Sequence, residues 1–405
     1  MKIALSVPGK FHTFDLAREL HAHGMLAGIL TGYPRFKLRS ERLPQASIHT
    51  FPWVQAPYMA NPFKQQMPNR WLQEWENVSA TTFARWAEST LPECDVYVGL
   101  SGSSLRAGRR QQARGGRYVC DRGSSHIREQ DSLLREEHLE WGVPYQGTDP
   151  RVVAREEAEY VQADCVTVPS RFVLDSFIKR GLSEHRLRLL PYGVNLSRFE
   201  PAGSPHPERF DVLFVGGMSL RKGVQYLVQA WSRFKHPAKS LTFVGTPSPE
   251  LIARLQTYQL WPDEVRVLGH VPQQELKHLM STSHVTVLPS IEEGLAMVMA
   301  QAMACGCPVI ASENTGARDL FDDGKEGFIV PIRDVSALAE RLQRLADEPR
   351  LRAGMSVAAL ARVQRMGGWR DYGLRALGIY QELVATRVTP EPSRTSAALG
   401  TALVP

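Results

Sequence analysis

The feature of this chain that most constrains its fold is a regular alternation of short apolar runs with longer helix-like stretches. The apolar runs are rich in Val, Ile and Leu and comprise Lys2–Val7, Val96–Leu100, Tyr118–Asp121, Cys165–Val168, Asp211–Val215, Leu241–Val244, Val265–Leu268, Val285–Leu288 and Pro308–Ala311. The helix-like stretches between them include Thr13–His23, Val152–Gln162, Ser170–Lys179, Val224–Phe234 and Gln273–Ser281. This order predicts an α/β fold in which helices connect buried parallel strands.

A cluster of turn-forming residues divides the pattern into two halves. The segment Phe199–Pro207 contains three prolines, a glycine and a serine, a composition that is typical of a domain boundary. We therefore expect two doubly wound, Rossmann-like domains, at 1–200 and 208–367, facing each other across a cleft. The pattern is purely helical after Asp334, and the residues from 386 to 405 lack periodicity, which predicts a flexible tail.

Composition excludes several classes of protein. The 405 residues are 43% hydrophobic and 22% charged, close to the averages for globular domains, which excludes a disordered, collagen-like or coiled-coil chain. A net charge of +6 is too small over this length to indicate nucleic-acid binding, but suits a phosphate-bearing partner or an anionic membrane face. No apolar stretch is long enough to span a bilayer, and the amino-terminal apolar run is too short for a secretory signal.

The five cysteines indicate reduced thiols rather than disulfides or a metal site. They are few, odd in number and embedded in apolar runs, as is typical of a cytoplasmic protein. Cys305 and Cys307 form only a C-x-C pair with no His or Cys cluster nearby, so we expect no metal there.

The most informative segment runs from Val285 to Ser312. It predicts a buried strand, an acidic loop ending in Glu293 and Gly294, an apolar helix and a second strand. Free amides at the start of that helix would attract phosphate, and the Glu293 carboxylate could accept hydrogen bonds from sugar hydroxyls. Gln301 is the only polar side chain between Leu295 and Cys305, so we expect either a backbone group or a ligand hydroxyl to satisfy it.

This segment resembles the family 4 retaining glycosyltransferases of GT-B fold. Glu293 and Gln301 stand at the two positions of the family's E-x7-E motif, and the flanking Leu288–Ser290, Ala302–Gly306 and Pro308–Ala311 are similar as well. The second glutamate is Gln301 here, so its usual bond to the nucleotide ribose would persist only as an uncharged contact. The resemblance also implies donor contacts from Gly294, Leu295, Ala296, Met297 and Val298.

A second segment, Phe214–Val224, reads as a strand, a glycine turn and two cations. Gly216 and Gly217 let the backbone approach a ligand, and Arg221 and Lys222 could bind phosphate, although such a pair is more often simply solvated. The segment resembles the family's loop that neutralises the donor diphosphate. The family often places its arginine where Gly217 stands, and we expect Arg221 to take over that role.

Further resemblances extend along the chain. They place the nucleotide base near His270 and Val271, and Gly9 near the diphosphate from the opposite wall; they liken Gly324–Pro331 to a hairpin after the site, and they return a helix at 368–385 to the amino domain. His126, after the strand ending at Asp121, could touch the transferred sugar or could be structural. Asp121 and Arg122 could simply pair with each other.

The segment from Phe51 to Trp75 concentrates aromatic side chains among cations. It contains Trp53, Tyr58, Phe63, Trp71 and Trp75 with Lys64 and Arg70. These side chains could dock a lipid-linked acceptor or a membrane face, or they could cover the core.

The resemblance implies a cytoplasmic enzyme that acts in bacterial polysaccharide or glycolipid assembly and could lie at the inner face of the plasma membrane. It would move a sugar with retention from a UDP- or GDP-linked donor to a hydroxyl of a saccharide or lipid-linked acceptor, by front-face attack. Arg221, Lys222, Glu293 and His126 are the expected catalytic residues, with no cofactor and no metal. The alternatives are a nucleotide-sugar epimerase of the same architecture and a non-catalytic nucleotide-sugar-binding protein.

Overall fold

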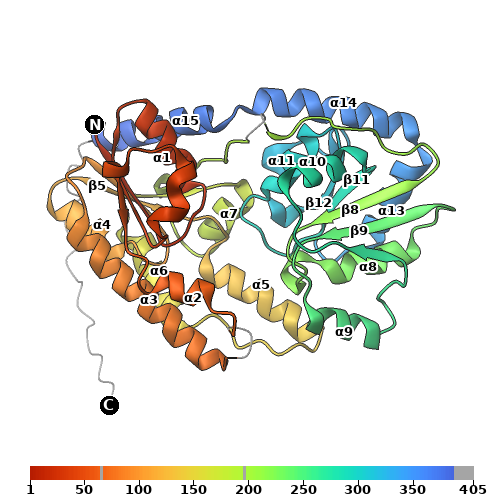
Figure 1. The fold of residues 1–405 in the computed structure, drawn as a ribbon, viewed down its shortest axis with the longest axis horizontal. Coiled ribbons are helices and arrows are strands. Elements are labelled where there is room, and N and C mark those ends of the chain that lie inside the picture. Colours follow the sequence, from red (N-terminus) through yellow and green to blue (C-terminus); the bar gives the residue numbers. More distant parts are fainter. Residues whose placement is uncertain (64–66, 195–197, 387–405) are drawn as a thin grey trace, which may run out of the picture.

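A computed structural model describes residues 1–63, 67–194 and 198–386, which build two parallel sheets with helices on both faces (Figure 1). The amino-terminal sheet has the order β3-β2-β1-β4-β5-β6-β7, and the carboxyl-terminal sheet has the order β10-β9-β8-β11-β12-β13. The first sheet comprises β1 (Ile3–Val7), β2 (Leu26–Thr31), β3 (Ile48–Thr50), β4 (Val96–Leu100), β5 (Arg117–Asp121), β6 (Cys165–Val168) and β7 (Leu187–Leu189). The second comprises β8 (Phe210–Val215), β9 (Lys239–Val244), β10 (Val265–Val267), β11 (Val285–Leu288), β12 (Val309–Ser312) and β13 (Gly327–Val330).

The helices connect these strands and cover the sheets. Those of the amino-terminal half are α1 (Thr13–Ala22), α2 (Gln55–Ala60), α3 (Asn69–Thr90), α4 (Leu105–Ala113), α5 (Ile127–Glu140), α6 (Pro150–Gln162) and α7 (Arg171–Lys179). Those of the second half are α8 (Val224–Arg233), α9 (Pro249–Thr257), α10 (Gln273–Thr282), α11 (Met297–Ala304), α12 (Ala317–Leu320), α13 (Val335–Asp347), α14 (Pro349–Met366) and α15 (Trp369–Ala385). The predicted α/β class with two Rossmann-like domains is thus confirmed.

One predicted element is wrong. The segment Gly324–Pro331 is not a hairpin: β13 lies parallel to β12, with Gly327 opposite Val309 and Phe328 opposite Ile310. A Cβ atom on Gly327 would lie 2.1 Å from the Val309 carbonyl oxygen, so only glycine lets the two strands approach here.

The chain crosses between the domains twice. After the first crossing it builds the second domain, and at its end α15 returns to pack against α1 (Figure 1). Tyr372, Ala376 and Tyr380 of α15 are buried in the same core as Phe14 and Leu20 of α1. Burial of these large aromatic side chains ties the last helix firmly to the first domain.

Helix α5 holds the two domains together from the other side. Glu137, which is fully buried, accepts hydrogen bonds from Gln225 Nε2 at 2.6 Å and from Arg333 Nε at 2.9 Å, both in the second domain. Trp141, directly after α5, is buried in the core of the second domain. Within the described residues, none of the helices combines the length and apolarity needed to cross a membrane.

Candidate functional site

The site is built where β8 and β11 end, at the edge of the second sheet that faces the first domain. After β8 the chain makes a short 3₁₀ turn over Leu220–Lys222, and the Ile291 amide, beyond β11, donates to the Arg221 carbonyl at 2.8 Å. Gly223 closes the turn with φ of +69°, and a Cβ there would lie 1.9 Å from the Pro289 carbonyl oxygen. Because it has no side chain, the glycine allows the two loops to pack this closely.

These loops bring two cations and two carboxylates together. Lys222 Nζ forms an ion pair with Glu293, and Arg221 Nη2 lies 3.5 Å from Glu293 Oε2. Arg221 Nε lies 2.9 Å from Glu292 Oε2. Burial would lower the pKa of Arg221, but the charges of Glu293 and Glu292 outweigh it and raise that pKa above its usual value. Three of the four expected catalytic residues are therefore neighbours, and their catalytic roles stay predictions.

Glu292 is a site residue that the sequence analysis did not single out. Its side chain is fully buried, and besides Arg221 it accepts hydrogen bonds from Ser125 N at 3.0 Å, Ser125 Oγ at 2.8 Å and Gln130 Nε2 at 3.0 Å. Burial would raise the pKa of Glu292, but Arg221 and the bonds from Ser125 hold it below its usual value. Since Ser125 and Gln130 belong to the first domain, this carboxylate joins the two domains at the site.

The start of α11 corrects the expectation of a run of free amides. The Glu293 amide donates to the Asn314 carbonyl at 2.9 Å, and the Ala296 amide to the Thr315 carbonyl at 3.1 Å. Within the described part of the chain, the amides of Gly294, Leu295, Met297 and Val298 have no such partner. The run of free amides predicted to bind phosphate is thus interrupted by two amides that already donate to backbone carbonyls.

Gly294 lies against the first domain. A Cβ atom on Gly294 would be 1.7 Å from the Gly123 carbonyl oxygen, and the Gly294 carbonyl accepts a hydrogen bond from Ser170 Oγ at 2.5 Å. Any side chain at position 294 would push the domains apart, so the glycine permits their close approach.

Gln301 is not the buried amide that the sequence suggested. It is half-exposed on α11, and among the described residues its side chain has no hydrogen-bond partner. The amide is therefore available to a ligand or to water, and no protein partner is needed to explain it.

The other expected donor contacts also lie at carboxyl ends of strands. Gly216, with φ of +150°, and Gly217 follow β8, and a Cβ atom on Gly216 would lie 3.8 Å from Cε of Lys222. His270, which is exposed, and Val271, which is buried, follow β10. In the first domain Gly9 follows β1, where its carbonyl accepts a hydrogen bond from Thr31 Oγ1 at 3.0 Å.

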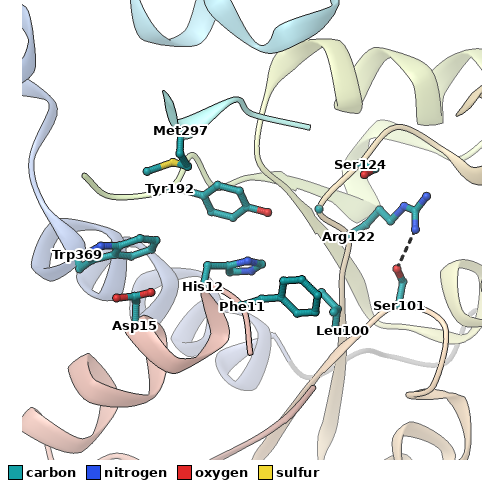
Figure 2. A pocket seen from close by; sticks show the side chains of 11 residues that line it. Phe11, His12, Asp15, Leu100, Ser101, Arg122, Ser124, Tyr192, Met297 and Trp369 are labelled. Atoms are coloured by element: carbon teal, nitrogen blue, oxygen red, sulfur yellow. Dashed lines mark hydrogen bonds between the residues drawn. The ribbon is translucent and has the colours of Figure 1, made fainter. Parts of the chain in front are cut away.

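A cavity of about 460 Å³ opens between the domains beside this cluster (Figure 2). It is lined by Phe11, His12, Asp15, Leu100, Ser101, Arg122, Gly123, Ser124, Tyr192, Met297 and Trp369. Most of this lining follows strands of the first domain, in the segments 11–12, 101 and 122–124 and at Tyr192, with Asp15 in α1 and Leu100 at the end of β4. Met297 comes from the start of α11 and Trp369 from the start of α15. The cavity therefore adjoins the charged cluster through the loop at 122–125.

His12 is one of the cavity residues that the sequence analysis did not single out. Its Nε2 lies 2.6 Å from Asp121 Oδ2, and its ring lies 4.3 Å from that of Tyr192. The imidazole is held by a carboxylate on one side and an aromatic ring on the other, and it faces the cavity in Figure 2. Its position directly before α1, near Gly9, was the only sequence signal available.

Asp121 and Arg122 do not pair with each other. Asp121 contacts His12 and accepts a hydrogen bond from Thr167 Oγ1 at 2.8 Å, whereas Arg122 Nη1 lies 2.7 Å from Glu156 Oε2. Successive residues at the end of a strand point to opposite faces, which explains why they take different partners.

His126 has a structural position. It is buried, its Nδ1 accepts a hydrogen bond from the Arg128 amide at 3.2 Å to cap α5, and its ring packs against Tyr160 and Phe177. Burial lowers the pKa of His126 to about 4, so the ring is neutral. It is absent from the lining of the cavity described above. These contacts favour the structural alternative, and the contact with the sugar stays a prediction.

The aromatic segment divides into a packed part and an exposed part. Tyr58 is buried and Phe51 stacks on Trp86, whereas Trp53, Phe63 and Trp71 are each more than half exposed. Lys64 lies outside the described residues. These three exposed rings do not cover the core, so the alternative in which the whole segment covers the core is wrong.

Comparisons with known proteins agree with the fold. Residues 209–348 match the family described as glycosyl transferases group 1. A D-inositol 3-phosphate glycosyltransferase of Acidothermus cellulolyticus is 30% identical over 266 residues, which are 59% of this chain and 59% of that protein. The chain thus spans about three fifths of this curated relative.

Solved structures share the whole architecture. Sucrose-phosphate synthase of Thermosynechococcus elongatus has a TM-score of 0.70 at 24% identity, covering 95% of this chain and 99% of that one. Anabaena HepE in complex with UDP-glucose has a TM-score of 0.64 at 16% identity, covering 94% and 100%. The two domains thus have the arrangement found in GT-B glycosyltransferases.

Proposed function

We propose that this chain is a retaining glycosyltransferase that moves a sugar from a nucleoside diphosphate sugar to a hydroxyl acceptor. The observation that carries the proposal is the meeting of Arg221, Lys222 and Glu293 at the edge of the second sheet, beside a cavity between the domains. The match of residues 209–348 to glycosyl transferases group 1 supports the same conclusion, because this stretch contains all three residues.

The donor diphosphate would replace carboxylates as the partner of the two cations. Arg221 and Lys222 can donate charge-assisted hydrogen bonds to phosphate oxygens, with further donors at the amides of Met297 and Val298. Glu293, freed from part of its ion pairing, would orient the sugar hydroxyls. A UDP-linked donor is favoured by the likeness to HepE, whose structure was solved in complex with UDP-glucose.

The reaction would proceed by front-face attack. As the bond between the sugar and the diphosphate breaks, negative charge grows on the leaving phosphate, which takes the proton of the attacking hydroxyl. Preorganised cations stabilise that charge more in the transition state than in the ground state. Arg221 and Lys222 supply this charge, so the proposal includes no metal ion.

The acceptor would occupy the cavity lined by His12, Tyr192 and Trp369. Aromatic faces suit the apolar faces of a sugar ring, and His12 and Asp15 offer polar atoms for its hydroxyls. A lipid-linked saccharide is one acceptor that fits, because the exposed Trp53, Phe63 and Trp71 could rest in a membrane interface and bring the first domain to its substrate. Polysaccharide or glycolipid assembly is the corresponding setting.

A panel of nucleotide sugars tests the proposal. Purified protein should be stabilised against heat by one donor or a few, and that donor should lose its sugar to water or to an added acceptor with the anomeric configuration retained. Isomerisation of the donor without acceptor would instead indicate an epimerase. Donor binding with neither hydrolysis nor transfer across an acceptor panel would indicate a binding protein.

A further inference from the structure

A second cavity also has Tyr192 in its lining, and it is strongly basic. Its volume is about 470 Å³, and it is lined by Pro191, Tyr192, Asp319, Leu320, Lys325, Arg362, Arg365, Met366 and Arg375. Four of these side chains are cations and one is a carboxylate. The size is within the range of pockets that hold small ligands.

The four cations come from three separate parts of the fold. Arg362 and Arg365 lie one turn apart on α14, Lys325 lies in the turn before β13, and Arg375 lies on α15. Because α14 belongs to the second domain and α15 packs on the first, the cavity is walled by both domains. Pro191 and Met366 mark the two places where the chain crosses between them.

Two of the arginines are oriented without being neutralised. Arg362 Nε donates to the Leu320 carbonyl at 2.9 Å, and Arg375 Nη2 donates to the Pro191 carbonyl at 2.8 Å. A backbone carbonyl fixes a guanidinium but leaves its full charge and its other N–H groups available.

The remaining charges leave the cavity with an excess of positive charge. Within the described residues Arg365 has no hydrogen-bond or ion-pair partner. Lys325 is only partly compensated, with Asp322 Oδ2 at 3.5 Å and Glu326 Oε1 at 3.9 Å. Asp319 uses one oxygen to accept a hydrogen bond from the Arg171 amide at 2.8 Å.

We propose that this cavity, called the hinge cavity below, binds a phosphate-bearing anion that contacts Arg362, Arg365 and Arg375. Planar guanidinium groups from two helices match the oxygens of a phosphate, and the apolar edges of Leu320 and Met366 leave room for the group that carries it. The phosphate could belong to a soluble metabolite or to a lipid headgroup. This inference does not depend on the proposed transfer reaction.

The position gives such an anion a structural consequence. It would connect α14 to α15 across both chain crossings, and it would lie against Tyr192, whose ring also packs on His12 in the first cavity. Binding would therefore favour the domain arrangement seen here.

Calorimetric titration with inorganic phosphate tests the hinge cavity directly. The wild-type protein should bind phosphate, and Arg365→Gln should weaken that binding about tenfold or more, as loss of a charged hydrogen-bond donor does. Arg370→Gln is the matched control, since Arg370 is an exposed arginine of the same crossing that does not line the cavity. Unchanged affinity in Arg365→Gln, or equal loss in Arg370→Gln, would overturn the proposal.

A further variant and a vesicle assay complete the test. Lys222→Ala should keep the phosphate affinity of the hinge cavity, because Lys222 lies in the other site; loss of all phosphate binding there would also overturn the proposal. Sedimentation with phosphatidylcholine vesicles, with and without phosphatidic acid, distinguishes the sources. Binding to acidic vesicles that requires Arg365 supports the proposal with a lipid headgroup as ligand, and phosphate binding without vesicle binding supports it with a soluble ligand. If the wild type binds neither probe, the proposal fails.

Discussion

Arg221 Nε lies 2.9 Å from Glu292 Oε2, and the same buried carboxylate accepts hydrogen bonds from Ser125 and Gln130 of the other domain. The arginine expected to hold the donor diphosphate is therefore also a partner of the residue that joins the domains. A diphosphate that draws Arg221 away from Glu292 would weaken one of four interactions at this junction, so donor binding and the domain arrangement are linked through one side chain.

Replacement of Glu292 should destabilise the protein. Glu292→Ala leaves the buried Ser125 amide and the partly buried Arg221 and Gln130 without this acceptor, which should lower the free energy of unfolding by about 3–5 kcal/mol. Thermal denaturation measures the effect. Glu136→Ala is the control, since Glu136 is an exposed partner of Arg333 and its loss should cost at most about 0.5 kcal/mol. Equal melting temperatures for the two variants would contradict the role of Glu292.

The same carboxylate predicts a dependence on pH. The pKa of Glu292 is held below its ordinary value of 4.5 in the folded state, so its contribution to stability is present above pH 4.5 and is lost as pH falls through the folded pKa. Glu292→Gln lacks this contribution. The difference in melting temperature between the wild type and Glu292→Gln should therefore shrink as the buffer is made more acidic than pH 4.5, and a constant difference would argue against the ionised state.

Removal of Lys222 should affect turnover more than folding. Lys222→Ala deletes a cation at the expected leaving phosphate and should reduce the transfer rate by about 100-fold or more. Steady-state kinetics with the donor identified by the thermal panel measures the change. Lys235→Ala, an exposed lysine of the same domain, should keep normal turnover. Near-normal turnover in Lys222→Ala would contradict the proposed role of Lys222 at the leaving phosphate.

His12 and His126 should behave in opposite ways. His12→Ala should slow transfer by about 10-fold or more with donor binding intact, because His12 faces the cavity in which the acceptor is proposed to bind. His126→Ala should leave the rate per folded molecule unchanged and lower the melting temperature, because it removes a helix cap worth about 1 kcal/mol and buried packing. Slower transfer in His126→Ala together with an unchanged rate in His12→Ala would instead indicate that His126 contacts the transferred sugar.

His126 also provides a second dependence on pH. Its pKa is about 4 in the folded state, against an ordinary value of 6.5. As the pH falls, His126 is therefore protonated in the unfolded state before it is protonated in the folded state. Stability is therefore undiminished above pH 6.5 and falls as pH drops from 6.5 to about 4. In His126→Ala this part of the pH profile should be absent, which denaturation at a series of pH values would detect.

Gln301→Glu should keep or improve donor affinity. The side chain is half-exposed and has no partner among the described residues, so a carboxylate there is solvated and can accept hydrogen bonds from ribose hydroxyls. Titration with the donor measures the affinity, and Gln301→Ala should weaken it. Complete loss of donor binding in Gln301→Glu would contradict the ribose contact.

Much of the fold could be predicted from the sequence because parallel strands are nearly continuous apolar runs. The strands Val96–Leu100, Cys165–Val168 and Val285–Leu288 have the predicted bounds, since each is buried on both faces. The strands β2, β3 and β7 were missed. β3 and β7 have three residues each and are partly exposed at the edges of the sheet, which leaves no apolar run to detect, whereas β2 was missed although four of its six residues are buried. The segment containing β13 was misread as a hairpin because the direction in which a strand pairs depends on its neighbour in the sheet, and the residues of the strand itself do not show that direction.

By itself, the sequence determined the α/β class and the two domains, because these depend on local periodicity. It also singled out the segments around Arg221 and Glu293 through their residue types and their resemblance to a known family, and the chemical roles of these segments stay predictions. The tertiary structure alone decided which histidine faces the cavity, that Glu292 joins the domains, and that the carbonyls of Asn314 and Thr315 occupy amides expected to be free. Each of these depends on contacts between residues far apart along the chain, and such contacts leave no periodic signal in one sequence.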